Sequence, residues 1–241
     1  MVKSKEHIYK FEYNFMTIQV FCLLLTILFS IVTFVVYLML GCDFFYNPSV
    51  VDEFLVYDSM FIFFVIMCLW LVLHEVIHGV SYVINGADYK NIKYGVVLEK
   101  GILYCKCGEY VDKKNILWSV INPFIYIGII TLIISFIIGS ATLLILSIIN
   151  ISGACADILM FLFFLKRDKN LKFREIKDSS TFILKTTEDL TNKKFFAVKL
   201  VEELDEEPEE ENDKLITISK ASKWIIIFIL VLFVISFIIR L

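Results

Sequence analysis

Five long runs of apolar residues constrain the fold of this chain more than any other feature. A transmembrane helix needs about 20 consecutive apolar residues to cross roughly 30 Å of hydrocarbon. The runs are 16–40, 60–84, 116–138, 141–165 and the shorter 224–239. The mean hydropathy of +0.78 and the 59% hydrophobic content exceed the roughly 45–50% apolar share of a soluble domain. The sequence therefore predicts an all-α membrane protein with about five transmembrane helices.

The positions of the positive charges predict how the chain crosses the membrane. Lysine and arginine collect in cytoplasmic loops. Of the 23 lysine and arginine residues in this chain, all except Arg240 lie in 1–15, 85–115 or 166–223. The segment between the first two runs, 41–59, has none. We therefore expect a multi-pass protein of the cell membrane with a cytoplasmic N-terminal tail and the C-terminus outside. The first run is too long for the core of a signal peptide, so we expect it to be a retained span.

A small β-hairpin is expected directly after the second span, in the cytoplasmic segment 85–115. Residues 91–98 and 102–107 are rich in β-forming side chains, and 99–101 reads as the turn between them. The edge of such a hairpin could take up a substrate as an added strand. It could equally be a plain connection between two helices.

The segment 166–223 is expected to be a charged cytoplasmic region. It contains one possible strand at 195–201 and then an acidic run at 202–213, which is most simply a solvated linker. The net charge of −3 gives no indication of a nucleic-acid partner. The lipid bilayer is the expected partner, and the sequence leaves the oligomeric state open.

Two of the three histidines lie four residues apart inside the second run, in the motif His74-Glu75-Val76-Ile77-His78. Positions i and i+4 share one face of an α-helix, so both imidazoles can bind one metal ion. Glu75 is rotated by about 100° and can reach a water at that metal as a general base. The alternative is a packed pair of histidines beside a buried glutamate, but three ionisable groups inside a span are costly and usually functional. We therefore predict a zinc site.

The third ligand of this site is predicted to be Asp157. A catalytic zinc takes three protein ligands and leaves one position for water, and the remaining histidine, His7, lies in the N-terminal tail. At about 1.5 Å of rise per residue, His78 and Asp157 lie roughly 10 and 13 Å above the cytoplasmic edges of their spans. A bound cation offsets the cost of burying the Asp157 carboxylate. A neutral or paired Asp157 within the helix bundle is the alternative.

Asn122 enters the same layer of the membrane from the third run, directly before Pro123. Proline interrupts the hydrogen bonding of a helix and frees backbone carbonyls. The Asn122 amide could satisfy that local polarity, or it could donate to an oxyanion that develops during a reaction. Asn122 is therefore a candidate catalytic residue with a local structural role as the alternative.

These residues resemble the putative zincin peptidases, a family of small multi-pass bacterial membrane proteins, and more distantly the site-2 proteases that cut within membranes. The resemblance covers roughly 60–180 and rests on the motif at 74–78, the hairpin insert, Asn122-Pro123 and Asp157. In the site-2 proteases the third ligand is the aspartate of a Leu-Asp-Gly motif. Here the neighbours of the aspartate are Ala156 and Ile158.

The resemblance implies a membrane-embedded zinc metalloprotease that hydrolyses peptide bonds of a membrane or membrane-proximal protein near the cytoplasmic leaflet. Zn²⁺ would be held by His74, His78 and Asp157. Glu75 would transfer the proton of the attacking water to the leaving amine, and Asn122 would aid the oxyanion. Two other classes stay open: a non-catalytic metal-binding membrane adaptor or sensor, and a zinc hydrolase of a non-peptide membrane substrate.

Overall fold

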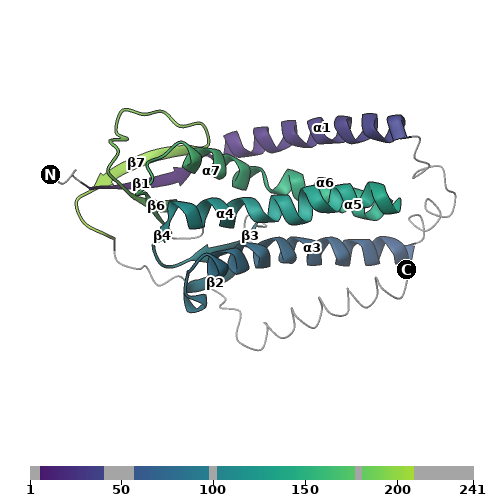
Figure 1. Ribbon diagram of the computed structural model, residues 1–241, viewed down its shortest axis with the longest axis horizontal. Helices are drawn as coiled ribbons and strands as arrows, with labels where there is room; N and C mark the ends of the chain where they lie inside the picture. Colours follow the sequence, from purple (N-terminus) through teal and green to yellow (C-terminus); the bar gives the residue numbers. More distant parts are fainter. Residues whose placement is uncertain (1–5, 41–56, 98–101, 177–180, 209–241) are drawn as a thin grey trace.

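The apolar helices of the protein lie side by side, and a β-sheet lies at one end of them (Figure 1). The computed structural model describes residues 6–40, 57–97, 102–176 and 181–208. The helices are α1 (Phe15–Leu40), α3 (Tyr57–Ile84), the 3₁₀ turn η1 (Tyr89–Asn91), α4 (Lys113–Pro123), the π-helix η2 (Phe124–Ile130), α5 (Thr131–Ile138), α6 (Ala141–Gly153) and α7 (Cys155–Leu165).

Three stretches of helix in the described ranges are long and apolar enough to cross a membrane. They are Phe15–Val36, Phe63–Ile84 and Lys113–Ile138, the last of which joins α4, η2 and α5. The pair α6 and α7 makes a fourth if it is taken as one span bent by 47°. These helices support the prediction of a membrane protein. The predicted fifth span, 224–239, lies outside the described residues.

The bend between α6 and α7 occurs at Ala154, whose φ of −75° and ψ of 12° leave the α-helical pattern. A break of this kind frees carbonyl groups of the last turn. The Ser152 carbonyl accepts hydrogen bonds from the thiols of Cys22 on α1 and Cys155 on α7. The Ser152 hydroxyl accepts one from Thr26 on α1 at 2.8 Å. Polar contacts between helices therefore hold the bent pair against α1.

A five-stranded antiparallel sheet corrects the prediction of an all-α protein, because the fold is mixed. Its strands lie in the order β4-β5-β6-β1-β7. They are β1 (His7–Tyr13), β4 (Val111–Asp112), β5 (Lys172–Glu175), β6 (Thr181–Thr186) and β7 (Val198–Leu204). β1 pairs with β6 and β7, which lie more than 150 residues later in the sequence. Phe11 of β1 is opposite Phe182 of β6. The strands are two to seven residues long, and most of their pairings join segments far apart in the sequence, so a local pattern does not reveal the sheet.

Aromatic side chains join this sheet to α7. The rings of Phe11 on β1 and Phe182 on β6 stack with their centroids 5.4 Å apart, and Phe163 on α7 meets Phe11 edge to face at 5.6 Å. Phe11 and Phe182 are fully buried. Such aromatic contacts bury a large apolar area, so the sheet anchors α7, whose first turn carries Asp157.

The predicted hairpin is present as β2 (Ile92–Val97) and β3 (Ile102–Cys107), which pair in antiparallel register. The turn between them lies outside the described residues. Both strands contact α3. The approach is close at Gly79, where an added Cβ would lie 1.9 Å from the Tyr94 hydroxyl oxygen. The hairpin therefore folds back along the helix that carries the histidines.

Candidate metal centre

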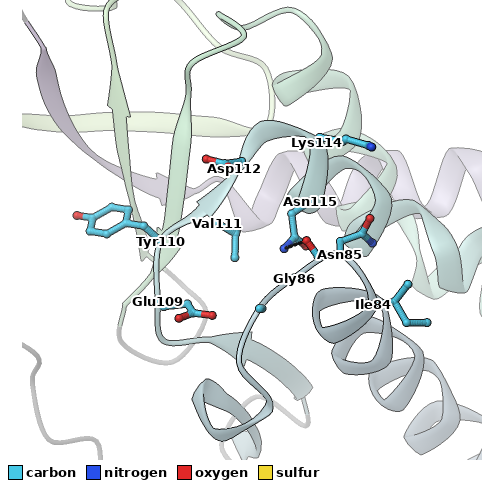
Figure 2. A pocket seen from close by; sticks show the side chains of 10 residues that line it. Ile84, Asn85, Gly86, Glu109, Tyr110, Val111, Asp112, Lys114 and Asn115 are labelled. Carbon is cyan, nitrogen blue, oxygen red and sulfur yellow. Dashed lines mark hydrogen bonds between the residues drawn. The ribbon is translucent and has the colours of Figure 1, made fainter.

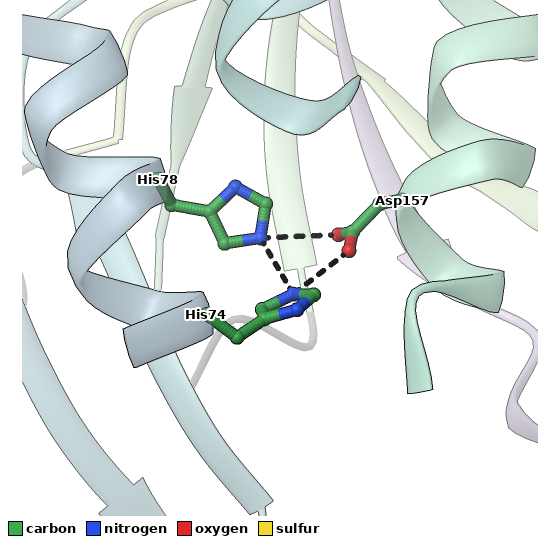
Figure 3. A group of neighbouring side chains, drawn as sticks. All are labelled: His74, His78 and Asp157. Carbon is green, nitrogen blue, oxygen red and sulfur yellow. Dashed lines mark hydrogen bonds and ion pairs between the residues drawn. The ribbon is translucent and has the colours of Figure 1, made fainter. Parts of the chain in front are cut away.

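The three side chains predicted as metal ligands lie together (Figure 3). His74 and His78 are one turn apart on α3, and Asp157 is in the first turn of α7. Nε2 of His74 is 3.1 Å from Nε2 of His78 and 3.0 Å from Oδ2 of Asp157. Nε2 of His78 is 3.5 Å from Oδ1 of Asp157. Both histidines are more than nine-tenths buried. Two helices thus bring three ligand atoms to one point.

The bend between α6 and α7 contributes to this geometry. Because α7 begins at Cys155, Asp157 lies at a helix N-terminus rather than in the middle of a continuous helix. The partial positive charge of a helix N-terminus stabilises a carboxylate. The bend therefore gives this partly buried acid one favourable interaction from its own backbone before any cation binds.

Hydrogen bonds behind the rings orient both imidazoles. Nδ1 of His78 lies 2.7 Å from the carbonyl oxygen of Ser119, which can only accept, so Nδ1 carries the proton. Asn150 donates from Nδ2 to the carbonyl oxygen of Pro123 at 3.2 Å. Its Oδ1 must therefore face Nδ1 of His74, which donates to it at 2.9 Å. Both rings present Nε2 to the centre, as a ligand histidine does when its other nitrogen is hydrogen-bonded.

The arrangement fits a tetrahedral zinc site. Two nitrogens that each lie 2.0–2.1 Å from zinc at the tetrahedral angle are about 3.3 Å apart. The three closest separations between the ligand atoms, 3.0 to 3.5 Å, bracket that value. In the neutral state the two Nε2 lone pairs and the carboxylate all face one another without a donor among them. A cation at their centre removes this repulsion.

Glu75, the predicted general base, lines a pocket beside the ligands. The pocket has a volume of about 180 Å³ and is lined by Leu71, His74, Glu75, Leu103, Asn150 and Gly153. It lies between α3, β3 and α6, and the backbone N–H of Cys105 on β3 approaches the Glu75 carboxyl. His74, a predicted metal ligand, and Glu75, the predicted general base, therefore line the same pocket.

The strand β3 turns a free edge toward this pocket. The N–H of Gly108 donates to the carbonyl of Asn91 at 2.9 Å, so the even-numbered amides of β3 face β2. The amides of Leu103 and Cys105 consequently face the opposite edge, on the side of Glu75. No other strand in the described part of the chain pairs with that edge.

Two cysteines near the site are poor metal ligands. Burial raises the pKa of the Cys107 thiol to about 11 and raises that of the Cys105 thiol as well. Metals bind the thiolate rather than the thiol. The trio of His74, His78 and Asp157 is the candidate metal group in the described residues.

A larger hollow of about 570 Å³ lies at the C-terminal end of α3 (Figure 2). The carboxylate oxygens of Glu109, which lines it, already accept hydrogen bonds from the backbone of Asp88 and the side chain of Asn91. The hollow contains neither the histidines nor Glu75; it is lined by Ile84, Asn85, Gly86, Ala87, Glu109, Tyr110, Val111, Asp112, Lys114 and Asn115. The smaller pocket is therefore the candidate active site.

Asn122 lies in the last turn of α4 and donates to the Ser81 hydroxyl of α3 at 2.8 Å. This contact joins α4 to α3 and does not satisfy a carbonyl freed by Pro123, and a catalytic role for Asn122 stays a prediction. Sequence reasoning missed Ser119 and the histidine contact of Asn150. Asn150 is seven residues, or about two turns, before Asp157, and this spacing was the available signal. Ser119 acts through its backbone, which the side-chain pattern does not reveal.

Comparison with known proteins supports the resemblance. Residues 67–172 match the family described as putative zincin peptidase. The matched segment holds the ligand trio, Glu75, Asn122 and Asn150. No significant match was found among curated proteins or solved structures. The expected resemblance to the putative zincin peptidases is therefore confirmed over residues 67–172, and the more distant likeness to site-2 proteases stays a prediction.

Proposed function

We propose that this protein is a membrane-embedded zinc metallopeptidase that hydrolyses peptide bonds of a membrane or membrane-proximal protein near the cytoplasmic leaflet. The observation that carries the proposal is the convergence of His74, His78 and Asp157 beside a pocket lined by Glu75. The family match to residues 67–172 supports the peptidase class. The proposed orientation places the sheet and the hairpin on the cytoplasmic side, in agreement with the distribution of lysine and arginine.

The proposed chemistry divides between the metal and the side chains. Zinc held by His74, His78 and Asp157 supplies a Lewis acid that acidifies water and polarises a carbonyl group. The Glu75 carboxylate takes the proton of the attacking water and returns it to the nitrogen of the leaving amine. Ser119 and Asn150 keep the two imidazoles in the orientation that exposes Nε2. Asn122 is the proposed donor to the oxyanion.

We propose that the substrate binds as an extended strand along the free edge of β3. The outward amide of Leu103 can donate a main-chain hydrogen bond to an added strand, whereas the next outward amide, that of Cys105, already approaches Glu75. Leu103 also lines the pocket together with Glu75 and His74. A strand on this edge would therefore carry its backbone past the metal ligands, and peptide bonds are the groups it would present there.

Replacement of Glu75 by glutamine tests the proposed function. The amide cannot accept the proton of water, so cleavage should fall by about 10²–10⁴-fold, while zinc stays near one ion per chain because the ligands are intact. Glu109→Gln, which changes a carboxylate outside the site, is the matched control and should retain cleavage. Comparing the proteomes of cells that express the wild type and Glu75→Gln would identify the substrates as proteins that accumulate uncut.

Three results would contradict the proposal. Cleavage by Glu75→Gln at the wild-type rate would remove Glu75 from the reaction. Identical proteomes, together with an unchanged cellular phenotype of the variant, would favour the non-catalytic adaptor or sensor. Accumulation of an uncut lipid amide in place of a protein would assign the same site to a non-peptide substrate.

A further inference from the structure

We infer that Pro123 is a positioning residue for the metal centre, because its missing N–H leaves the Ser119 carbonyl free to hold His78. Within an α-helix the N–H of residue i donates to the carbonyl of residue i−4. The donor for Ser119 would therefore be residue 123, and proline has no N–H. The inference rests on the proposed metal site, but it concerns contacts that the chain makes by itself.

The hydrogen bonds around Ser119 support this assignment. The next amide, that of Phe124, donates to the carbonyl of Ile121 and so does not replace the missing bond. The Ser119 hydroxyl donates to Asn115 Oδ1 at 3.0 Å, away from its own carbonyl. Ser119 is fully buried, and an unpaired buried carbonyl is costly. Nδ1 of His78, at 2.7 Å, takes the place of the absent amide.

The same irregular stretch of helix also orients the other histidine. The carbonyl of Pro123 accepts from Asn150, whose Oδ1 receives the Nδ1 proton of His74. The π-helix η2 begins directly after this proline. Gly128 in η2 lets α6 approach, because an added Cβ would lie 2.9 Å from Ile151 Cγ1 and 3.3 Å from Asn150 Nδ2. Two carbonyls of one helix, at positions 119 and 123, thus set both ligand rings.

The hydrogen bonds that orient His78 and His74 can be removed separately. Pro123→Ala restores an N–H that competes with His78 for the Ser119 carbonyl, yet it keeps the carbonyl at position 123 for Asn150. Asn150→Leu removes the partner of His74 and leaves Pro123 in place. Loss of a hydrogen bond behind a ligand histidine typically weakens metal affinity by about 10–100-fold. Each variant should therefore disturb one ring, and each should raise the dissociation constant for zinc by about that factor.

The test is NMR of the full-length, metal-free protein in lipid nanodiscs with ¹⁵N-labelled histidine. The chain has three histidines, so the ring Nδ1–H signals can be assigned by removing His7, His74 and His78 in turn. Pro123→Ala should speed water exchange of the His78 Nδ1–H and leave that of His74 unchanged, and Asn150→Leu should do the reverse. Val120→Ala, which trims a buried side chain of the same helix without adding a donor, should change neither.

Two outcomes would overturn the inference. One is an unchanged His78 signal in a folded Pro123→Ala sample. The other is an equal disturbance of both rings by each variant, which a general loss of structure would produce. Because the signals are read without metal, they separate this inference from the proposed function. Selective effects in a protein that binds no zinc would uphold the positioning role and refute the zinc peptidase.

Discussion

Substitution of Gly79 by alanine tests the close packing of the hairpin on the motif helix. The new Cβ would lie 1.9 Å from the hydroxyl oxygen of Tyr94, 2.7 Å from its Cζ and 3.1 Å from Cγ2 of Ile92. The tyrosine ring must therefore recede by about 1.5 Å to regain ordinary van der Waals contact. Overpacking of this kind typically costs about 1–3 kcal/mol, which corresponds to a fall in Tm of roughly 2–12 °C for a chain of this size.

A second substitution reverses the sign of this effect. In a Tyr94→Ala background the obstruction is gone, and alanine is about 1 kcal/mol better than glycine inside a helix. Gly79→Ala should then be neutral or stabilising, with only the contact to Ile92 to adjust. Thermal unfolding of the four proteins of the cycle in the same detergent measures both effects. Destabilisation of equal size in the two backgrounds would refute the packing argument.

The displaced hairpin should also affect cleavage. Tyr94 pairs with Cys105 in the β2–β3 ladder, and the outward edge of β3 faces Glu75. We expect Gly79→Ala to reduce cleavage while zinc content stays near that of the wild type, because both ligand histidines remain on α3. Loss of zinc in parallel with cleavage would show that the substitution acts on the ligands and not on the hairpin.

Three further predictions concern other parts of the molecule. Leu103→Pro removes an outward amide of β3 and should lower cleavage with zinc retained; full cleavage by the folded variant would refute strand addition. Burial raises the pKa of Glu175 on β5 from 4.5 to about 8, so its contribution to stability is complete below pH 4.5 and is lost as the pH rises through 8. Glu175→Gln should flatten that part of a Tm–pH profile, and an unchanged profile would contradict the burial argument. Ser140 caps α6 by accepting from the Leu143 amide, so Ser140→Ala should cost about 0.5–2 kcal/mol in unfolding experiments.

The candidate metal centre was largely predictable, because its signals are local or depend only on the depth of each residue in the membrane. The spacing of His74 and His78 follows from helical periodicity. The position of Asp157 follows from counting residues from the membrane edge, and the structure places its carboxylate 3.0 Å from His74. The hairpin also follows from a local pattern of β-forming residues. These inferences need no knowledge of how distant segments pair.

The features that the sequence did not reveal depend on tertiary contacts. β1 carries alternating buried side chains at Tyr9 and Phe11, but its partners are more than 150 residues away along the chain. The apolar run 141–165 is long enough for one continuous span, so the bend at Ala154 was not predicted, although Gly153 lies directly before it. The acceptor of the His78 proton is a backbone carbonyl, which every residue carries. The proline four residues later was visible, but its role requires the packing of α4 on α3.

Measurement of zinc per chain tests the central claim most directly. The purified wild type should hold close to one zinc ion, as should Glu75→Gln, whereas His74→Ala should hold almost none and Asp157→Ala should bind it much more weakly. His7→Ala is the control, because His7 lies on β1 and pairs with Glu203; it should retain the metal. Absence of zinc from folded wild-type protein, or equal zinc content in all five proteins, would contradict the assignment.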